Sequence, residues 1–401
     1  VTAESTQIDV KTAKAALFPS LSFSTSQQVV NRPYQETSSR VSGSEIISSN
    51  SKTSYNGNYG LNASWTIYNG SKRLKTLKQE RLNNQVAELD VATSENTIKE
   101  SIAQIYIQIL YAAESVRVNE NTLQVSIAQR DRGQELLNAG SIAKSDFAQL
   151  EAQVSTDRYQ LVTAQATLQD YKLQLKQLLE LDGENEMNVY LPKLSDENVL
   201  APLPAKKDVY VSALAIRPEI EASKLNVEAS ELGIDIAKSS YFPTISLSAG
   251  IGTNHTSGSD FTFGEQVKNG WNNSIGLSVS VPIFNNRQTK SAVQKAKLQR
   301  ETDMLSLLDE QKALYKTIES LWLDANSAQQ RYAAANEKLR STQISYDLIS
   351  EQFNLGMKNT VELLTEKNNL LQAQQEQLQA KYMAILNTQL LKFYQGDKLT
   401  L

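Results

Sequence analysis

The sequence of 401 residues contains no cysteine and a single histidine, His255. Without cysteine the chain can form no disulfide, thiolate metal site or thiol nucleophile, and this composition suits an oxidising or extracytoplasmic compartment. One imidazole without clustered carboxylates makes neither a zinc site nor a catalytic triad. We therefore expect His255 to be a solvated loop residue, and we predict no enzyme, no metal site and no cofactor.

Charge and hydropathy exclude two further classes. The formal net charge is −4 and Lys and Arg form no cluster, so we expect no nucleic-acid partner. No run of about 18 apolar residues is present, so no membrane-spanning helix is predicted. The chain begins at Val1 with neither an initiator Met nor a signal peptide, and we expect it to be processed or trimmed, with some N-terminal residues missing.

Proline is absent from two long segments, Gly70–Leu181 and Asn286–Gln395. Both segments have few glycines and are rich in Gln, Ala, Leu, Lys and Glu, which predicts long helices. Their apolar residues step by three and four, as in coiled coils, although ordinary antiparallel hairpins also show this spacing. The predicted seams of the second segment include Ala325, Ala328, Tyr332, Ala335, Leu364 and Leu371. Gly140 and Gly356 interrupt the segments and predict a capped turn between a long arm and a return arm. At 1.5 Å per residue, the first arm would span roughly 100 Å.

The two helical segments belong to an internal duplication. Val1–Pro19 aligns with Leu225–Pro243, and the tetrapeptides that begin at Ile67 and Ile283 also match. We therefore predict two repeats, 1–181 and 217–401, joined by a linker, 182–216. Half of the eight prolines lie between Asp182 and Pro218, so this linker should be irregular, with a short strand near Met187–Leu191.

Each repeat opens with the end of a helix that stops at a Phe-Pro pair, after which the apolar period changes from 3.6 to 2. Alternating Leu, Ile, Val and Trp predict one apolar face, and the intervening Ser, Gly and Asn predict an uncharged polar face. We expect external loops at Tyr34–Gly57 and Asn254–Gly270. The predicted strands cover residues 19–33, 58–68, 244–253 and 271–282.

Two interpretations of these strands are open. A soluble sandwich or hairpin would turn its polar face to water, but such faces usually carry Lys, Glu and Arg. An uncharged polar face opposite an apolar one is more typical of a membrane barrel, with lipid outside and a water-filled lumen inside. Aromatic residues near the strand ends suit the interfacial belts of such a barrel. These candidate membrane-interface residues are Trp65, Tyr68, Trp271 and Phe284.

Four strands are too few to close a barrel, and open edges in lipid would leave backbone groups without hydrogen-bond partners. Several chains must therefore share one barrel. Two chains would provide eight strands and a filled interior, whereas three would provide twelve strands and an open channel.

The Phe-Pro strand openings, the strand exit Pro282–Phe284 and the tips Leu137–Ser141 and Phe353–Met357 resemble the TolC-type outer-membrane efflux proteins. The resemblance covers both repeats in order. It implies a mixed fold, in which each chain of a homotrimer gives four strands to a 12-stranded β-barrel in outer-membrane lipid. The barrel is continuous with a periplasmic α-helical coiled-coil barrel, and the linker 182–216 is expected to form part of an equatorial region. It also implies an exit duct for efflux or type I secretion, with a periplasmic adaptor protein and an inner-membrane transporter as partners.

The resemblance further implies a periplasmic gate at the helical tips. Glu362 and Thr365 stand where the family has two acidic positions that narrow the pore, so one carboxylate ring is lost. We expect a weak link between Asp146 and Lys358, and a trimeric ring of Glu362 carboxylates that attracts cations and raises its own pKa. The candidate gate residues are Glu362, Thr365, Asp146, Ser145, Lys358 and Phe353.

The same tips are the expected docking site for helical hairpins of the adaptor. The candidate docking residues are Asn138, Ala139, Gly140, Ser141, Leu355, Gly356 and Met357. A soluble or periplasmic coiled-coil scaffold is the alternative function, and it would require strands that face water. A hydrolytic enzyme would require a convergent cluster of acid, base or nucleophile, which the sequence does not offer.

Overall fold

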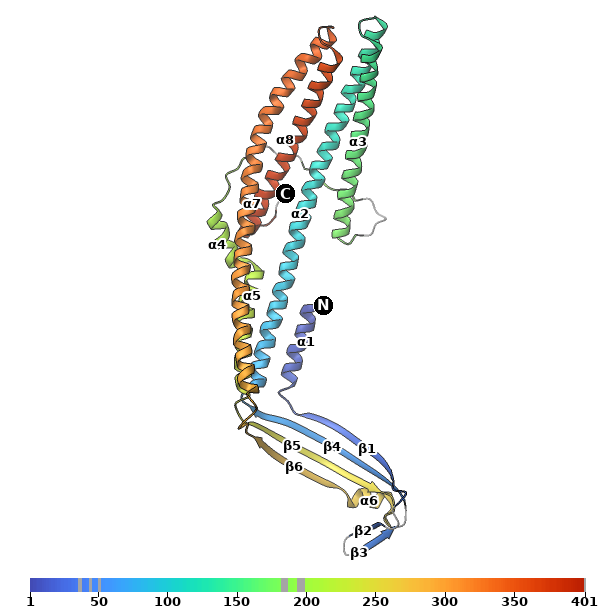
Figure 1. Cartoon of the computed structure of the whole chain (residues 1–401), viewed down its shortest axis with the longest axis vertical. Coiled ribbons are helices and arrows are strands. Elements are labelled where there is room, and N and C mark those ends of the chain that lie inside the picture. Colours follow the sequence, from blue (N-terminus) through green and yellow to red (C-terminus); the bar gives the residue numbers. More distant parts are fainter. Residues whose placement is uncertain (35–37, 43–44, 50–51, 182–186, 193–198, 400–401) are drawn as a thin grey trace. The chain divides into compact units, whose positions relative to one another are not determined.

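The computed structural model describes residues 1–34, 38–42, 45–49, 52–181, 187–192 and 199–399 (Figure 1). Contacts divide the chain into two compact units, and each unit combines one part of repeat 1 with one part of repeat 2. The first unit comprises Val1–Leu89 and Ala222–Leu307, and the second comprises Asp90–Glu221 and Leu308–Leu401. Each compact unit is therefore built from corresponding parts of both repeats, and neither unit is a single repeat.

Both repeats place a helix before paired strands, a 67-residue helix and a shorter return helix. The elements of the first repeat are α1 (Thr2–Ala15), β1 (Ser20–Asn31), β2 (Ser38–Ser42), β3 (Glu45–Ser49), β4 (Thr53–Asn69), α2 (Lys72–Asn138) and α3 (Lys144–Leu178). Those that follow are α4 (Lys206–Ile216), α5 (Pro218–Ser239), β5 (Thr244–Thr256), α6 (Phe263–Asn269), β6 (Asn272–Ser280), α7 (Gln288–Asn354) and α8 (Thr360–Gln395). This order repeats as the duplication in the sequence predicts.

The principal sheet has four antiparallel strands in the order β1-β4-β5-β6, with β1 and β6 at its edges (Figure 1). The register brings apolar residues together on one face: Phe23 lies opposite Leu61, which in turn lies opposite Ile251. Neighbouring polar positions pair in the same way, as Asn62 does with Gly250. The predicted alternation thus becomes one apolar and one uncharged polar face. β2 and β3 form a separate two-stranded sheet.

The ends of the strands distant from the helices differ from the prediction. β4 begins at Thr53 and β5 continues to Thr256, so both extend into residues predicted as loop, and the following loop contains α6. His255 therefore lies in β5, and its ring packs against the rings of Tyr55, Tyr59 and Phe263, with centroids 5.0–5.9 Å apart. The expectation of a solvated loop histidine was wrong, because these neighbouring aromatic residues cover the ring.

The linker is also more regular than its prolines suggest. Residues 187–192 contain no strand, so the short strand predicted near Met187–Leu191 is wrong, and residues 182–186 and 193–198 lie outside the described part. Residues 206–216 form α4, where an irregular segment was expected. No proline interrupts these residues, and Val209 and Ala213 are fully buried, so tertiary packing stabilises this short helix.

An apolar core in the second unit joins α4 and α5 to the long helices. Ile220, Ile318, Ala325 and Leu391 are among its buried members. At its edge, the buried Arg217 forms an ion pair with Glu100 at 3.0 Å, and its guanidinium carbon lies 3.6 Å from the centre of the Tyr394 ring. Burial, assisted by the charge of Glu100, raises the pKa of Tyr394 to about 12.

The predicted heptad register of α7 is confirmed in its middle part, where Ala325, Ala328, Tyr332 and Ala335 are all buried. Small alanine side chains allow the neighbouring helix to approach closely, and Ala328 and Tyr332 pack against Ala380 of α8. Over the part of the chain that the structure describes, no helix has both the length and the hydropathy needed to cross a bilayer.

Candidate functional site

The chain reverses direction at two turns, between α2 and α3 and between α7 and α8, at the same end of the second unit (Figure 1). Gly140 and Gly356 adopt left-handed conformations with φ of 74° and 76°. Each amide donates a hydrogen bond of 2.9 Å to a carbonyl three residues earlier. No atom would crowd a Cβ at either position, so it is the positive φ that requires glycine.

The residues predicted to dock an adaptor are exposed around these turns. Leu355 and Met357 expose 69% and 65% of their surface, which is unusual for apolar side chains without a partner. The other residues of the set share this exposure: Asn138, Ala139, Gly140, Ser141 and Gly356. The two turns therefore present small and apolar groups to a potential partner.

The start of α8 carries a polar cap that includes the predicted gate residue Glu362. The side chain of Asn359 accepts from the amide of Glu362 at 2.9 Å, and the Glu362 carboxylate accepts from the amide of Asn359 at 3.2 Å. This reciprocal pair is a capping box. Lys358 donates to the other carboxylate oxygen at 2.6 Å. Thr365, one turn further, is exposed and donates its hydroxyl proton to the carbonyl of Val361.

These contacts hold the pKa of Glu362 below its usual value, chiefly through Lys358 and secondly through the amide of Asn359. The sequence had predicted a raised pKa from repulsion in a trimeric ring. Within one protomer the cation and the amide stabilise the charged carboxylate, and the rise expected in a trimeric ring stays a prediction. Any repulsion between three copies would have to overcome this stabilisation.

Asp146 lies in the first turn of α3, where its carboxylate accepts from the amide of Ala143 at 3.4 Å. A negative charge at this position is favourable because it faces the positive end of the helix dipole. Ser145, beside it, is exposed. In the described part of the protomer, Lys358 pairs with Glu362 and not with Asp146. The predicted Asp146–Lys358 link is therefore not formed within one chain, where the carboxylate one helical turn away is the partner of Lys358, and a link between chains stays a prediction.

Phe353 is not on the surface of the tip. Its side chain is 2% exposed and packs with Leu150 of α3 and Leu363 of α8 in an apolar cluster. Phe353 therefore contributes to packing between helices, and this apolar site does not require a side chain that forms hydrogen bonds. Gly133 of α2 contributes to the same packing, because a Cβ at that position would overlap the side chain of Leu150.

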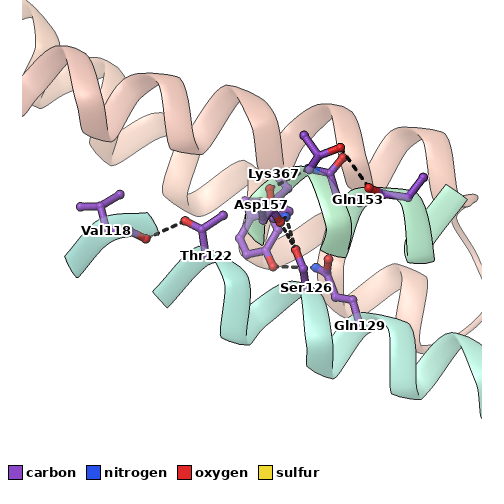
Figure 2. A network of polar contacts seen from close by, with 10 residues as sticks. Val118, Thr122, Ser126, Gln129, Gln153, Asp157 and Lys367 are labelled. Atoms are coloured by element: carbon purple, nitrogen blue, oxygen red, sulfur yellow. Dashed lines mark hydrogen bonds and ion pairs between the residues drawn. The ribbon is translucent and has the colours of Figure 1, made fainter. Parts of the chain in front are cut away.

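A group of buried polar side chains that was not predicted from the sequence lies behind the tips (Figure 2). Lys367 of α8 donates to both Asp157 of α3 and Ser126 of α2, and Ser126 also donates to Asp157. Gln153 donates to the second carboxylate oxygen of Asp157 at 2.9 Å. The side chains of Lys367 and Asp157 are only 4% and 1% exposed. We call Ser126, Asp157 and Lys367 the buried junction.

Burial lowers the pKa of Lys367, and the hydrogen bond and charge of Asp157 oppose part of this fall. Removing one partner from a buried pair typically costs about 3–5 kcal/mol, because the remaining charge stays buried without compensation. The buried junction joins three helices at one point: α2 and α3 of repeat 1, and α8 of repeat 2.

A heptad signal could have identified one member of the junction, Asp157. Asp157 continues the buried seam of Leu150 and Val154, where an apolar residue is expected. On α8, the predicted seam through Leu364 and Leu371 was shifted by one residue. The buried face instead includes Leu363, Lys367, Leu370 and Ala373. The sequence offered leucines on both faces of this helix, so the periodicity alone could not distinguish them.

The predicted membrane-interface aromatics lie near both ends of the strands. Trp65 and Tyr68 belong to the end of β4, and Phe284 follows β6 at the same side of the sheet, whereas Trp271 precedes β6 at the other side. Their surfaces are 38–82% exposed. The indole of Trp65 donates to the carbonyl of Leu17 at 2.8 Å. Their assignment to two aromatic belts on either side of an apolar band stays a prediction.

Comparison with known proteins gives relatives over most of the chain. The outer membrane efflux protein BepC of Brucella suis is 26% identical over 294 residues, which are 73% of this chain and 61% of BepC. The outer membrane protein TolC of Escherichia coli is 24% identical over 341 residues, which are 82% of this chain and 66% of TolC. The chain thus spans less than two thirds of the length of these two relatives.

Solved structures share the fold. A structure of CusC superimposes with a TM-score of 0.82 at 19% identity, covering 99% of this chain and 87% of CusC. The outer membrane protein VceC of Vibrio cholerae gives 0.78 at 16% identity, covering 100% and 92%. The predicted fold class, a duplicated protomer with four strands and long helical hairpins, is confirmed. A family profile for outer membrane efflux proteins matches residues 2–180 and 209–396, so both the TolC-type resemblance and the outer-membrane localisation are confirmed. The chain belongs to the family of outer membrane efflux proteins.

Proposed function

We propose that the protein is the outer-membrane exit duct of a tripartite efflux or type I secretion system and conducts its cargo passively. The observation that carries this proposal is the sheet with one apolar and one uncharged polar face. On the edge strands the apolar side chains are widely exposed, 68% for Phe23 and 79% for Ile275. Such a surface needs lipid or another apolar partner to cover it.

The polar face supports passive conduction. Its hydroxyl and amide groups bridge neighbouring strands, as Asn62 does to Ser24 and Ser248 does to the carbonyl of Gly276. The four strands carry no charged side chain. A lumen lined in this way would present no charge filter and no cluster of strong binding groups to a passing solute.

The open edges of the sheet favour a homotrimer. Among the described strands, β1 and β6 each have one neighbour, so each protomer offers one free edge on either side. Joining β6 of one chain to β1 of the next satisfies these backbone groups, which would be costly to leave unpaired in lipid. Three chains give twelve strands and an open channel, whereas two would give a barrel filled by side chains.

At the helical end, we propose that the exposed turns dock hairpins of a periplasmic adaptor, which in turn connects to an inner-membrane transporter. Two turns per protomer would give six similar grooves around a trimer. Glu362 and Thr365 would narrow the pore here, and the three Glu362 side chains would attract cations.

The proposal is tested with the full chain in mild detergent and in planar bilayers. Light scattering should give the mass of three chains, and the reconstituted protein should conduct ions. A monomer that neither inserts nor conducts would contradict the proposal and would favour the coiled-coil scaffold instead. In that case the apolar strand face would need a protein partner.

A further inference from the structure

We propose that the buried junction of Ser126, Asp157 and Lys367 is a fixed anchor between the two repeats, so that movement of the gate begins on the tip side of Lys367. This inference rests on the proposed function, because it concerns how a gated duct opens. It assigns to these three residues a role distinct from that of the exposed tip residues, which would rearrange while the junction stays closed.

The buried junction cannot open gradually. Lys367 and Asp157 are almost fully buried and come from different helices, so separating them would leave two opposite charges unpaired in a dry environment. Ser126 and Gln153 occupy further hydrogen-bonding positions around the carboxylate (Figure 2). Partial displacement would break several directional contacts together, so α8 should stay attached to α2 and α3 at this level.

The contacts on the tip side are of a different kind. The cluster of Leu150, Phe353 and Leu363 is apolar, and contacts of this type have no directional requirement that resists sliding. A polar contact there, from Arg132 to the carbonyl of Asn354, measures 3.4 Å and is exposed to solvent. Water can replace such a bond at little cost. The tips can therefore shift while the junction holds.

The junction also distinguishes α7 from α8. The junction includes no residue of α7. Two polar contacts of α7 lie nearby: the Tyr346 hydroxyl accepts from Gln129 at 2.8 Å, and the Ser345 hydroxyl donates to Glu366 of α8 at 3.1 Å. Both hydrogen bonds are only partly buried, so each is simpler to break than a buried ion pair. We therefore expect α7 to move more than α8 when the gate opens. On α8, movement should be confined to the residues between the tip and Lys367.

The decisive experiment loosens the tip and leaves the junction intact. The double variant Arg132→Ala/Lys358→Ala of the full chain in detergent is compared with the wild type by hydrogen exchange. Because both contacts are exposed and weak, exchange should rise by roughly threefold to fivefold in peptides covering 136–147 and 353–361, and should stay within about 1.5-fold in peptides covering 122–130, 154–160 and 364–371. An equal rise in both sets would overturn the proposal.

A second experiment breaks the junction itself. Lys367→Met should raise exchange by roughly tenfold in α2, α3 and α8 together, because one anchor joins all three helices. Lys338→Met is the matched control: Lys338 also pairs with a carboxylate of α8, Glu376, at 2.7 Å, but both side chains are more than 40% exposed. A Lys367→Met effect no larger than that of Lys338→Met would also overturn the proposal.

Bilayer recordings on the same proteins separate this proposal from the proposed function. The tip variant should raise the fraction of time that the channel is open, and Lys367→Met should raise it further. If neither the wild type nor any variant conducts, the exit-duct function fails, and the anchoring of a gate fails with it. If the proteins conduct and only exchange near the junction disagrees, the anchor alone is wrong.

Discussion

Lys358 lies just before the start of α8 and Lys367 lies within it, and both pair with carboxylates. Their surroundings make the first ion pair weak and the second costly to break. Lys358 binds Glu362 one turn away, and the two side chains are 33% and 41% exposed. Lys367 binds Asp157 of another helix, and both are almost fully buried. The first pair belongs to a local helix cap, and water can replace its contacts. The second pair joins separate helices, and removing one partner leaves a buried charge without compensation.

The largest expected effect comes from breaking the buried pair. Lys367→Met should destabilise the protein by about 3–5 kcal/mol, seen as a lower midpoint of thermal unfolding by circular dichroism. The double variant Lys367→Met/Asp157→Leu should recover most of this loss, because no unpaired charge remains. If the double variant were as unstable as the single variant, shape and not charge would dominate at this site.

A smaller effect on stability is expected from substitutions of the glycines in the exposed turns. Gly356→Val should cost about 1–3 kcal/mol, because a β-branched residue resists a left-handed conformation. Export should fail while light scattering still shows trimers. Gly356→Asn is the control at the same position, since Asn tolerates this conformation, and it should retain export. Normal export by Gly356→Val would remove the reason for placing adaptor docking at this turn.

The cap of α8 should contribute less again. Asn359→Ala should lower stability by about 1 kcal/mol, because the amide of Glu362 loses its acceptor. The corresponding position of α3 is Ala143, which has no capping side chain. Ala143→Asn should therefore raise stability by a similar amount. Equal thermal midpoints for wild type and both variants would mean that solvent satisfies these helix ends.

The smallest effects on stability are expected at the exposed pair. Lys358→Ala should change the thermal midpoint little and raise the open probability only slightly, because water screens the pair. Glu362→Gln should reduce cation selectivity in planar bilayers without much changing the leak. Selectivity that survived Glu362→Gln would show that this side chain does not line the constriction.

The pH dependence of selectivity sharpens the same comparison. The pKa of Glu362 is lowered in the folded protomer. The charged carboxylate therefore contributes fully to the stability of the fold above the usual carboxyl pKa, and this contribution is lost as the pH falls through the lowered pKa. Cation selectivity should therefore persist to a lower pH than an isolated carboxylate would allow. Lys358→Ala should move this loss to higher pH, and an unchanged profile would indicate that the ion pair is absent in the assembled channel.

Much of the fold was determined by the sequence itself. Proline-free segments predicted the helices α2, α3, α7 and α8, alternating residues predicted the four strands of the main sheet, and glycines marked the two turns. These signals are local, because backbone conformation and side-chain period follow from neighbouring residues. The aligned repeats added the order of elements, which the similarity to known channels confirms.

Tertiary structure decided the rest. A lysine such as Lys367 reads as a solvated charge in sequence, and only the approach of α2 and α3 provides Ser126 and Asp157 to bury it. His255 was misplaced for the same reason, since its aromatic neighbours come from other elements. The sequence by itself determined which segments are helix and strand, because those preferences are short-range. Which face of α8 is buried, and which charges lose their water, depended on packing between segments far apart in the chain.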